Sequence, residues 1–545
     1  MSVFFDSPLD PSLIAIEEPK LLLESISITD GITLEESGDY RQLLAGVHDC
    51  AEKILRLPDY QCSSDSPAYP RGNIHRPTDE ENVLGHAWAH RFHIRGNPSG
   101  GPLKGKTVCL KDCIAVAGVP QFFGTDAFAP WTPKRDAAVV TRALDAGAEV
   151  VGTATCENFC NSTSSFTSAQ GVVENPFAEG YSSGGSTSGG AALVGAGHVH
   201  IAIGADQGGS IRIPAAFCGC VGLKPTHGLV PYTGVTSGDA INDHVGPIAR
   251  TVLEVASCLD ALSGQDRLDD RTLGAPPRGS TSFAKSLRPA LSSTAGFRVG
   301  ILVEGFEHQL VDPAIKDLVL RAARRFETLG AIVEQVSVPC HMEGPAVWTI
   351  QQRISGALNL LGLQHGRRGL YPTEFEEARL PWTNASFQRL FPTTKNTMIN
   401  GLYLAKNFPG LYPKTLNLAQ QLKDSYEKLF ETYDVVVMPT VPCIVPKHVD
   451  WRQGESPLKA LKPSVGLTIN TAIFNITGHP AMTIPVGFLP AKDDHTIQLP
   501  VGMQLVGGLW QEQKILDAGH AWQSTFDWMN FNAEDAPIQR PPTRL

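Results

Sequence analysis

Two segments rich in glycine and serine, separated by a small apolar run, limit how this chain can fold. They cover residues 184–190 and 206–210, and the residues between them are mainly alanine, valine and isoleucine. Glycine lets a chain turn with its N–H groups directed inward, because a Cβ would block both the backbone angles and the approach of a ligand. The two segments therefore predict tight turns at the ends of buried elements. Each turn would present a serine, Ser186 in the first and Ser210 in the second.

A single upstream lysine completes this set of polar groups. Lys111 ends the apolar run 107–110 and is soon followed by a second apolar run, 114–116. A serine hydroxyl is a weak nucleophile that needs an adjacent base. Lysine acts as a base only when it is neutral, and its unperturbed pKa is about 10.4. We therefore expect burial to lower the pKa of Lys111 by about 3 units. Two hydroxyls and one amine indicate a nucleophilic hydrolase that works without histidine.

The block from residue 184 to residue 224, GGSTSGGAALVGAGHVHIAIGADQGGSIRIPAAFCGCVGLK, resembles the signature of the amidase signature family of serine hydrolases. Other motifs stand in the family's order, so that the resemblance covers roughly residues 85–525: Lys111-Asp112 and residues 152–157, 438–440, 475–480 and 500–504. The tract 224–234 is most similar to amidases of nitrile metabolism in actinobacteria. One departure lies at residues 186–190, where most members have Ser-Ser-Gly-Gly-Ser and this chain has STSGG.

The resemblance implies a role for each site residue. Ser210 would be the nucleophile, Ser186 a bridging serine on a cis peptide bond, and Lys111 the base. The backbone N–H groups of the second turn would form the oxyanion hole, and one cysteine would lie beside the serines in the substrate pocket: Gln207, Gly208, Gly209 and Ser210 for the hole, and Cys160 for the pocket. We interpret Asp206 and Arg212, which flank the nucleophile, as a structural ion pair.

The implied activity is hydrolysis of small carboxylic amides to an acid and ammonia or an amine, through an acyl-enzyme on Ser210. Carbamates (a urethanase activity) and aryl esters are further possible substrates. The resemblance implies neither a cofactor nor a metal. One alternative is the A subunit of a tRNA-dependent amidotransferase, which shares the signature but works inside a complex. The N-terminal segment and the tract 224–234 favour a stand-alone amidase.

Strand-like and helical runs alternate along the chain, which is typical of an α/β protein. The resemblance implies a mixed β-sheet core flanked by helices on both faces, with an N-terminal helical extension. The expected strands and helices include strands at 107–110, 150–152 and 201–204 and helices at 137–148 and 189–196. We expect an extension over residues 1–80 and an amidase signature domain over residues 81–545. Within that domain, residues 345–430 would form a variable helical region near the pocket.

The expected extension carries apolar residues at helical spacing, and a helix with an apolar stripe must bury it against something. Two-fold dimers are the commonest homo-oligomers, so we expect a homodimer in which residues 1–80 supply much of the interface. The net charge of −10, with scattered basic residues, argues against a nucleic-acid partner. The chain lacks an apolar run long enough to span a membrane. Its N-terminus lacks the pattern of a signal peptide, and its 11 unclustered cysteines suit a reducing compartment, so a cytoplasmic location is expected.

A third alternative, a non-enzymatic nucleotide- or metal-binding protein, rests only on two further motifs. Residues 100–107 match the phosphate-loop pattern letter for letter, but that loop works only between a strand and a helix, and here a strand is expected to follow. Pro102 would also remove one of the N–H groups that hold phosphate. His86, His90 and His93 would share one face of a possible helix, without a cysteine or carboxylate at ligand spacing. We therefore expect neither nucleotide nor metal binding.

Overall fold

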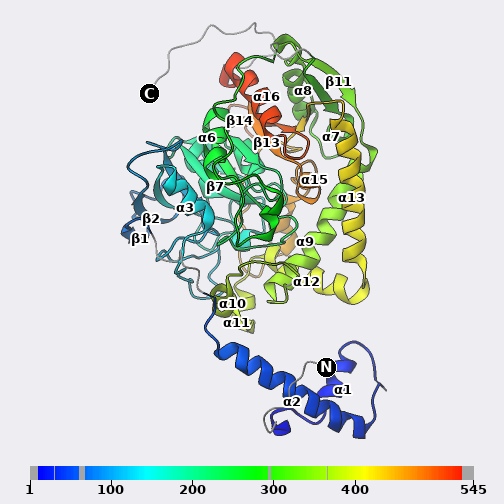
Figure 1. The fold of residues 1–545 in the computed structure, drawn as a ribbon. Coiled ribbons are helices and arrows are strands. Elements are labelled where there is room, and N and C mark those ends of the chain that lie inside the picture. The colour runs from blue at the N-terminus through cyan, green and yellow to red at the C-terminus, as the bar shows by residue number, and fades with distance from the viewer. Residues whose placement is uncertain (1–9, 30, 61–67, 292–295, 365, 531–545) are drawn as a thin grey trace. The chain divides into compact units, whose positions relative to one another are not determined.

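The computed structural model describes residues 10–29, 31–60, 68–291, 296–364 and 366–530 (Figure 1). The chain divides into two compact units, residues 1–66 and residues 67–545. Residues 72–75, which lie within the range expected for the extension, form strand β1 (Gly72–His75) of the larger unit.

The smaller unit is helical, as the apolar spacing predicts. Its elements are a 3-10 turn and two helices: η1 (Pro11–Leu13), α1 (Glu18–Glu24) and α2 (Leu34–Arg56). A capping box starts α2, because Thr33 accepts the N–H of Glu36 while the Glu36 carboxylate accepts the N–H of Thr33 at 2.7 Å. Arg41 of α2 donates to the carbonyl of Ile14 at 2.7 Å and so holds the two parts of the unit together.

The larger unit contains a mixed sheet of 12 strands, in the order β1-β2-β4-β3-β7-β9-β8-β13-β14-β12-β10-β11. Strand β3 runs parallel to both β4 and β7, and strand β10 runs parallel to both β11 and β12. The other neighbouring strands of this sheet pair antiparallel. The remaining strands of this sheet are β2 (Trp88–Arg95), β3 (Thr107–Lys111), β4 (Glu149–Ala154), β7 (Ile201–Asp206), β8 (Val221–Lys224), β9 (His244–Ala249), β10 (Arg298–Leu302), β11 (Ile332–Val336), β12 (Val435–Pro439), β13 (Ala481–Pro490) and β14 (Gln498–Val506).

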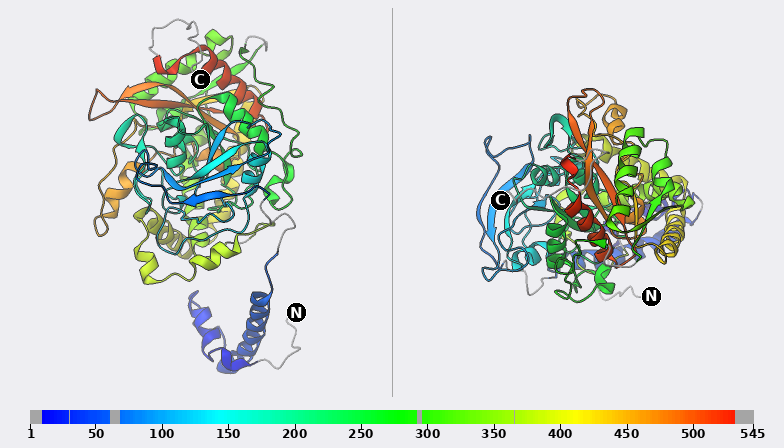
Figure 2. Two further views of the ribbon diagram at one scale, coloured as in Figure 1. Left: turned by 90° about the vertical axis from the view of Figure 1, so that its left-hand side faces the viewer. Right: turned by 90° about the horizontal axis from the view of Figure 1, so that it is seen from above.

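Helices cover both faces of this sheet (Figures 1 and 2). Side chains alternate between the faces of a strand. In β7, Ile201 accordingly joins the same apolar cluster as Val252, whereas Ala202 joins the cluster of Ala191. The first face carries α3 (Ala138–Asp145), α6 (Val252–Leu262), α8 (Pro313–Arg324) and α16 (Glu512–Thr525), and the second carries α4 (Ser188–Gly195) and α5 (Arg212–Phe217). The predicted fold class is confirmed.

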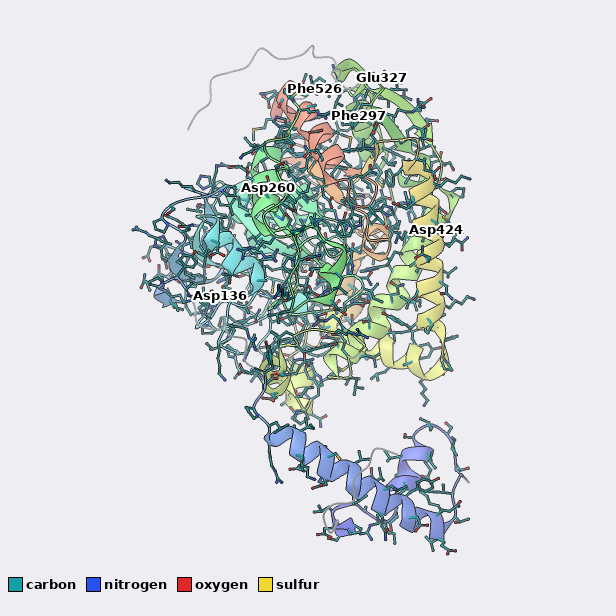
Figure 3. The ribbon with its side chains drawn as sticks, in the orientation of Figure 1. Asp136, Asp260, Phe297, Glu327, Asp424 and Phe526 are labelled. Carbon is teal, nitrogen blue, oxygen red and sulfur yellow. The ribbon has the colours of Figure 1, made fainter. Side chains whose placement is uncertain are left out.

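In the described part of the expected helical region between residues 345 and 430, the chain forms five helices: α9 (Gly344–Leu360), α10 (Thr373–Arg379), α11 (Asn384–Gln388), α12 (Pro392–Asn407) and α13 (Leu411–Phe430). Helix α9 packs against both α12 and α13. Shorter elements complete the unit: β5 (Glu174–Asn175), β6 (Ala178–Ser182), α7 (Val303–Glu307), α14 (Pro457–Leu461) and α15 (Ile473–Ile476). A surface segment after α6 is fixed to it by Asp260, labelled in Figure 3, which accepts the N–H groups of Phe283 and Ala284.

The three histidines do not share a helix face, so that part of the sequence interpretation is wrong. His90 and His93 lie on strand β2, where His90 stacks on the Phe122 ring and His93 hydrogen-bonds to Glu149. His86 precedes the strand and hydrogen-bonds to Asn82. In the part of the chain that the structure describes, no group of three or more histidine, cysteine or carboxylate side chains is arranged to hold a metal ion.

The phosphate-loop-like residues lie in turns between β2 and β3, and strand β3 follows them as expected, so they do not cap a helix. Among the described helices, none combines the length and the apolar character that a membrane span requires.

Candidate active site

The site lies where parallel strands β3 and β7 end. Lys111 is the last residue of β3, and β7 ends at Asp206, just before the second glycine-rich turn. Because the two strands are parallel, with Leu110 opposite Ile203, their carboxyl ends meet at one edge of the sheet. The Lys111 amine accordingly donates to the carbonyl of Ala205 at 3.2 Å.

Ser186 lies directly against Lys111. The two residues are almost completely buried, and Lys111 Nζ donates to Ser186 Oγ at 2.7 Å. The Gly185–Ser186 peptide bond is cis, as the resemblance implies. A Cβ on Gly185 would lie 2.3 Å from the carbonyl oxygen of Ser164, so the turn requires glycine there.

Ser210 stands at the end of the second turn, just before α5, and it is 7 % exposed. It lines an open cavity of about 470 Å³ together with Gln207 and Gly208. The backbone joins the two serine-bearing turns, since the N–H of Thr187 donates to the carbonyl of Ser210 at 3.3 Å. The structure therefore brings the three predicted catalytic residues to one place beside a cavity.

Asp206 and Arg212 form the predicted ion pair, at 2.9 Å and with both side chains fully buried. The Asp206 carboxylate also accepts the N–H groups of Gly209 at 2.7 Å and Ile211 at 3.0 Å. Burial favours the protonated acid, but the Arg212 guanidinium and these donors hold the pKa of Asp206 below its usual value. A charged Asp206 thus fixes the turn that carries Ser210.

The late motifs of the chain reach the same ion pair. Arg212 donates to the side-chain oxygens of Asn475 at 2.7 Å and Gln504 at 2.8 Å, and to the carbonyl of Thr471 at 2.8 Å. Asn475 in turn donates to the carbonyl of Asp206 at 2.9 Å. Segments more than 250 residues away in the sequence therefore hold the Ser210 turn in place.

The expected oxyanion hole needs one correction. The N–H of Gly209 points at the Asp206 carboxylate, so it is engaged within the protein. Gln207, Gly208 and Ser210 remain as candidate donors. This backbone lies against α9, because Trp348 Nε1 donates to the carbonyl of Gln207 at 2.8 Å. A Cβ on Gly208 would lie 2.4 Å from the Trp348 ring.

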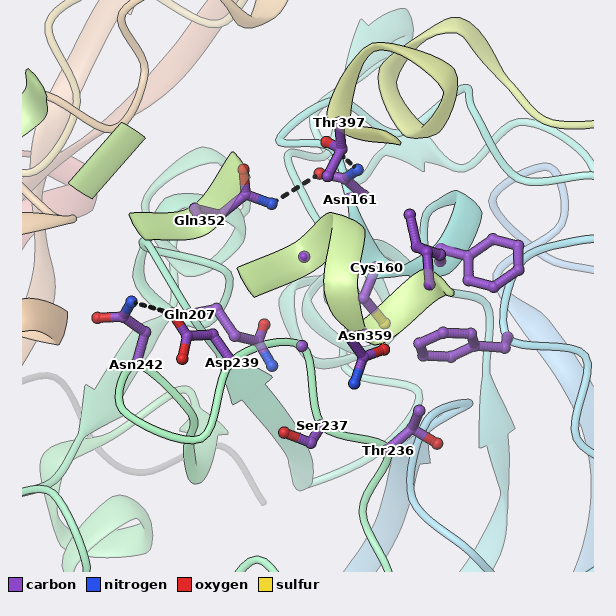
Figure 4. Close-up of a pocket in the computed structure, with 15 residues that line it drawn as sticks. Cys160, Asn161, Gln207, Thr236, Ser237, Asp239, Asn242, Gln352, Asn359 and Thr397 are labelled. Atoms are coloured by element: carbon purple, nitrogen blue, oxygen red, sulfur yellow. Dashed lines mark hydrogen bonds between the residues drawn. The ribbon is translucent and has the colours of Figure 1, made fainter. Parts of the chain in front are cut away.

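A narrower inner cavity of about 60 Å³ adjoins the open one, and the two share Cys160, Asn161, Gln207 and Gln352 in their walls (Figure 4). Its lining combines two aromatic rings with many polar side chains: Phe123, Phe159, Cys160, Asn161, Gln207, Thr236, Ser237, Gly238, Asp239, Asn242, Gln352, Gly356, Asn359, Leu360 and Thr397. Helices α9 and α12 thus supply part of the wall. Burial raises the pKa of the Asp239 carboxyl in this wall to about 6.

Cys160 lines both cavities, which agrees with the pocket position that the resemblance implies. Its thiol interacts electrostatically with Lys111 and with the thiols of Cys113 and Cys156. Burial favours the neutral thiol, but hydrogen bonds from Cys113 and Cys156 and the Lys111 charge hold the pKa of Cys160 well below its usual value.

The same interaction changes the expectation for Lys111. Burial disfavours the ammonium, but the charge interactions with Cys160 and Asp206 favour it, and the pKa of Lys111 lies above its usual value. The prediction that burial alone would lower this pKa is therefore wrong. The physical reason is the nearby groups of opposite charge.

Several residues of the site carried no signal in the sequence. Trp348 was one of many aromatic residues between 345 and 430, and Asp239 belonged to no motif. Cys113 and Cys156 could have been found, because Cys113 directly follows the Lys111-Asp112 motif and Cys156 belongs to the motif at residues 152–157. Their neighbourhood to Cys160 depends on the fold.

Comparison with known proteins agrees with this fold and this arrangement of residues. The family model described as Amidase matches residues 78–516. An enantioselective amidase from Rhodococcus rhodochrous is 38 % identical over 81 % of this chain and 83 % of the relative. The A subunit of the glutamyl-tRNA(Gln) amidotransferase of Natronomonas pharaonis is 35 % identical over 77 % of this chain and 96 % of the relative. The native peptide amidase from Stenotrophomonas maltophilia has a similar structure, with a TM-score of 0.62 and 26 % identity over 78 % of this chain and 83 % of that one.

The family match extends over most of the larger unit and includes both glycine-rich turns. This match and the mixed sheet between helices define an enzyme of the amidase class. The chain belongs to the amidase signature family, and it is an enzyme that hydrolyses amide C–N bonds.

Proposed function

We propose that this protein hydrolyses small carboxylic amides as a stand-alone amidase, with Ser210 as nucleophile, Ser186 as proton bridge and Lys111 as base. The observation that carries the proposal is the buried 2.7 Å hydrogen bond from Lys111 to Ser186, beside a cavity that Ser210 lines. A buried amine in contact with a hydroxyl is the arrangement that a lysine base requires.

In the proposed first half-reaction, neutral Lys111 takes the proton of Ser186 while Ser186 takes the proton of Ser210. The Ser210 oxygen then attacks the amide carbon. The N–H groups of Gln207, Gly208 and Ser210 are the candidate donors to the oxyanion. The proton returns through Ser186 to the leaving nitrogen, the C–N bond breaks, and ammonia or an amine departs.

In the second half-reaction, a water molecule replaces the amine. It gives its proton through Ser186 to Lys111 and attacks the acyl carbon. The bond from the acyl carbon to Ser210 then breaks, the proton returns from Lys111 through Ser186 to the Ser210 oxygen, and the carboxylic acid leaves. Carbamates and aryl esters offer the same carbonyl to Ser210, so we include them as candidate substrates.

The cavities support a small acyl group. An inner cavity of about 60 Å³ next to an opening of about 470 Å³ suits a small acyl group inside and a leaving group towards the opening. The test is hydrolysis by the purified full-length chain of benzamide, an alkyl carbamate and an aryl ester. We expect benzamide to be converted without a second protein.

The amidotransferase A subunit is the second candidate, because a relative of that name is 35 % identical. Such a subunit works inside a complex, so its chain alone would leave benzamide and an alkyl carbamate unhydrolysed. An assay of both compounds with the isolated chain decides between the two functions.

We further propose that the protein is a homodimer that uses the smaller unit. This unit exposes an unusual number of large apolar side chains: Leu13, Ile16, Leu21, Leu22, Ile26, Ile28, Leu34, Tyr40, Val47, Ile54, Leu55, Leu57 and Tyr60. On α2, Tyr40, Val47 and Ile54 recur every seventh residue, the spacing of a helix–helix contact. A second copy of this chain would present the same apolar stripe, and the two stripes would cover each other.

A further inference from the structure

Three cysteines meet beside Lys111 although they come from different elements. Cys113 closely follows β3 and Cys156 closely follows β4, and these parallel strands end at the same edge of the sheet. Cys160 belongs to the short turn η2 (Asn158–Cys160). Its thiol interacts electrostatically with the other two thiols and with the Lys111 amine.

Access distinguishes Cys160 from the other two. Cys113 and Cys156 are each 1 % exposed, whereas Cys160 is partly exposed and lines both cavities of the site. Figure 4 shows Cys160 in the wall of the inner cavity. Within this cluster, a molecule that enters the substrate cavity therefore meets the sulfur of Cys160.

The backbone fixes the position of this sulfur. Phe159 and Cys160 both have left-handed backbone angles, with φ of 52° and 53°, which is uncommon for residues other than glycine. The N–H of Cys160 donates to the carbonyl of Glu157 at 2.8 Å, and the buried Glu157 carboxylate accepts from Thr167 Oγ1 at 2.7 Å. The turn is therefore held from inside the protein.

Charge makes the same residue the reactive one. The thiolate, not the thiol, attacks sulfur and carbon electrophiles. Burial alone would raise the pKa of Cys160, but two thiol donors and the Lys111 ammonium lower it, so the thiolate is the favoured form. Burial raises the pKa of both Cys113 and Cys156, so these remain thiols.

We propose that Cys160 is a covalent modification site for small disulfides that enter the substrate cavity, and that its modification reversibly closes the active site. This inference rests on the proposed function, because the closed site is the one that would hydrolyse amides.

The reaction is thiol–disulfide exchange. The Cys160 thiolate attacks one sulfur of the small disulfide, a new S–S bond to Cys160 forms, and the other half leaves as a thiolate that takes a proton from water. The disulfide is the only oxidant required. A dithiol reductant then attacks the mixed disulfide and returns the Cys160 thiolate.

Occupation of the cavity would stop hydrolysis. The added group fills an inner cavity of only about 60 Å³, where we place the acyl group of the substrate. A displacement of reacting groups by about 1 Å lowers rates on the order of 10²-fold, and we expect a loss of at least that size.

The test treats the full-length protein with hydroxyethyl disulfide and follows both amide hydrolysis and peptide mapping by mass spectrometry. We expect progressive loss of activity, an adduct on Cys160, slower modification when a substrate amide is present, and recovery with dithiothreitol. Each variant is compared with its own untreated activity. Cys160→Ala should keep that activity during treatment, whereas Cys340→Ala, which removes a partly exposed cysteine elsewhere, should lose it like the wild type.

Three results would overturn the inference: a Cys160 that stays unmodified, a fully modified Cys160 with activity retained, or a Cys160→Ala enzyme as sensitive as the wild type. If the protein hydrolyses no amide at all, the proposed function fails. Peptide mapping then still decides whether Cys160 is the reactive thiol. Its second readout is whether an amide in the cavity slows the modification of Cys160.

Discussion

Ser186 is the residue through which the proposed base and nucleophile exchange a proton. It is fully buried, it accepts a hydrogen bond from Lys111 at 2.7 Å, and its turn is joined through Thr187 to the backbone of Ser210. A small hydroxyl side chain can transfer this proton, because the rate of the transfer depends on how precisely the reacting groups are positioned.

Removing any of the three hydroxyl or amine groups should therefore be severe. Ser210→Ala should abolish the acyl-enzyme, and Lys111→Met, which keeps the length of the side chain, should lower kcat by about 10³-fold or more. Ser186→Ala should be nearly as damaging. Steady-state kinetics measures the loss, intact-protein mass spectrometry detects the acyl-enzyme, and thermal melting checks folding. A folded Lys111→Met enzyme with most of its kcat would remove the base assignment.

The pH dependence should report the charge on Lys111. Protonated lysine is inert, so kcat/KM should rise with pH until the pKa of Lys111, and the raised pKa places that rise in the alkaline range. In Cys160→Ala the negative neighbour is gone while burial remains, so the pKa of Lys111 should fall and the rise should move to lower pH. Rate profiles from about pH 6 to about pH 10 test both statements. A flat profile for the wild type, or an unmoved profile for the variant, would contradict them.

At the scale of elements, the turn between β7 and α5 is held by Asp206 and Arg212, and these in turn by Asn475 and Gln504. Neutral amide side chains around a buried ion pair satisfy its remaining donors and acceptors, which an ion pair in the interior requires. The late motifs, although far from Ser210 in the sequence, thus hold the turn that carries it.

Asn475→Ala should loosen this turn. The loss removes one acceptor of the Arg212 guanidinium and the side-chain donor to the carbonyl of Asp206, and an unsatisfied buried group costs about 1–3 kcal/mol. We expect a lower melting temperature and a decrease in kcat larger than the change in KM. Asn407→Ala is the matched control, because this exposed asparagine makes only a local hydrogen bond to Tyr403. Equal effects of the two variants would argue against a role for Asn475 at the site.

The sequence predicted some elements well and others badly, for physical reasons. Strands β3 and β7 and helix α4 are continuous buried runs next to glycine turns, so composition alone indicated them. Strand β2 was missed, because the spacing of His90 and His93 suggested a helix although the buried Phe92 and Ile94 alternate with less buried residues along a strand. The raised pKa of Lys111 depends on Cys160, which lies next to it only in the folded chain.

At the scale of the whole molecule, the proposed mechanism assigns every proton and every charge to groups of the chain itself. The oxyanion donors supply the electrostatic stabilisation that zinc supplies in metallohydrolases. Activity should therefore survive dialysis against EDTA or phenanthroline. Loss of activity that returns with added zinc would overturn this expectation, and mass spectrometry under native conditions would then identify the ion.

The apolar stripe on α2 gives the last prediction. Val47 is 55 % exposed and Ile54 is 67 % exposed, and large apolar side chains in such a row destabilise a monomer in water unless a partner covers them. We expect light scattering to show the full-length protein as a dimer at micromolar concentration. The double variant Val47→Glu/Ile54→Glu should be monomeric, because two copies would place like charges in an apolar contact. A control variant, Glu52→Gln on the same helix, should stay dimeric. A wild-type protein that scatters as a monomer would refute the dimer and leave the assignment of Lys111, Ser186 and Ser210 unchanged.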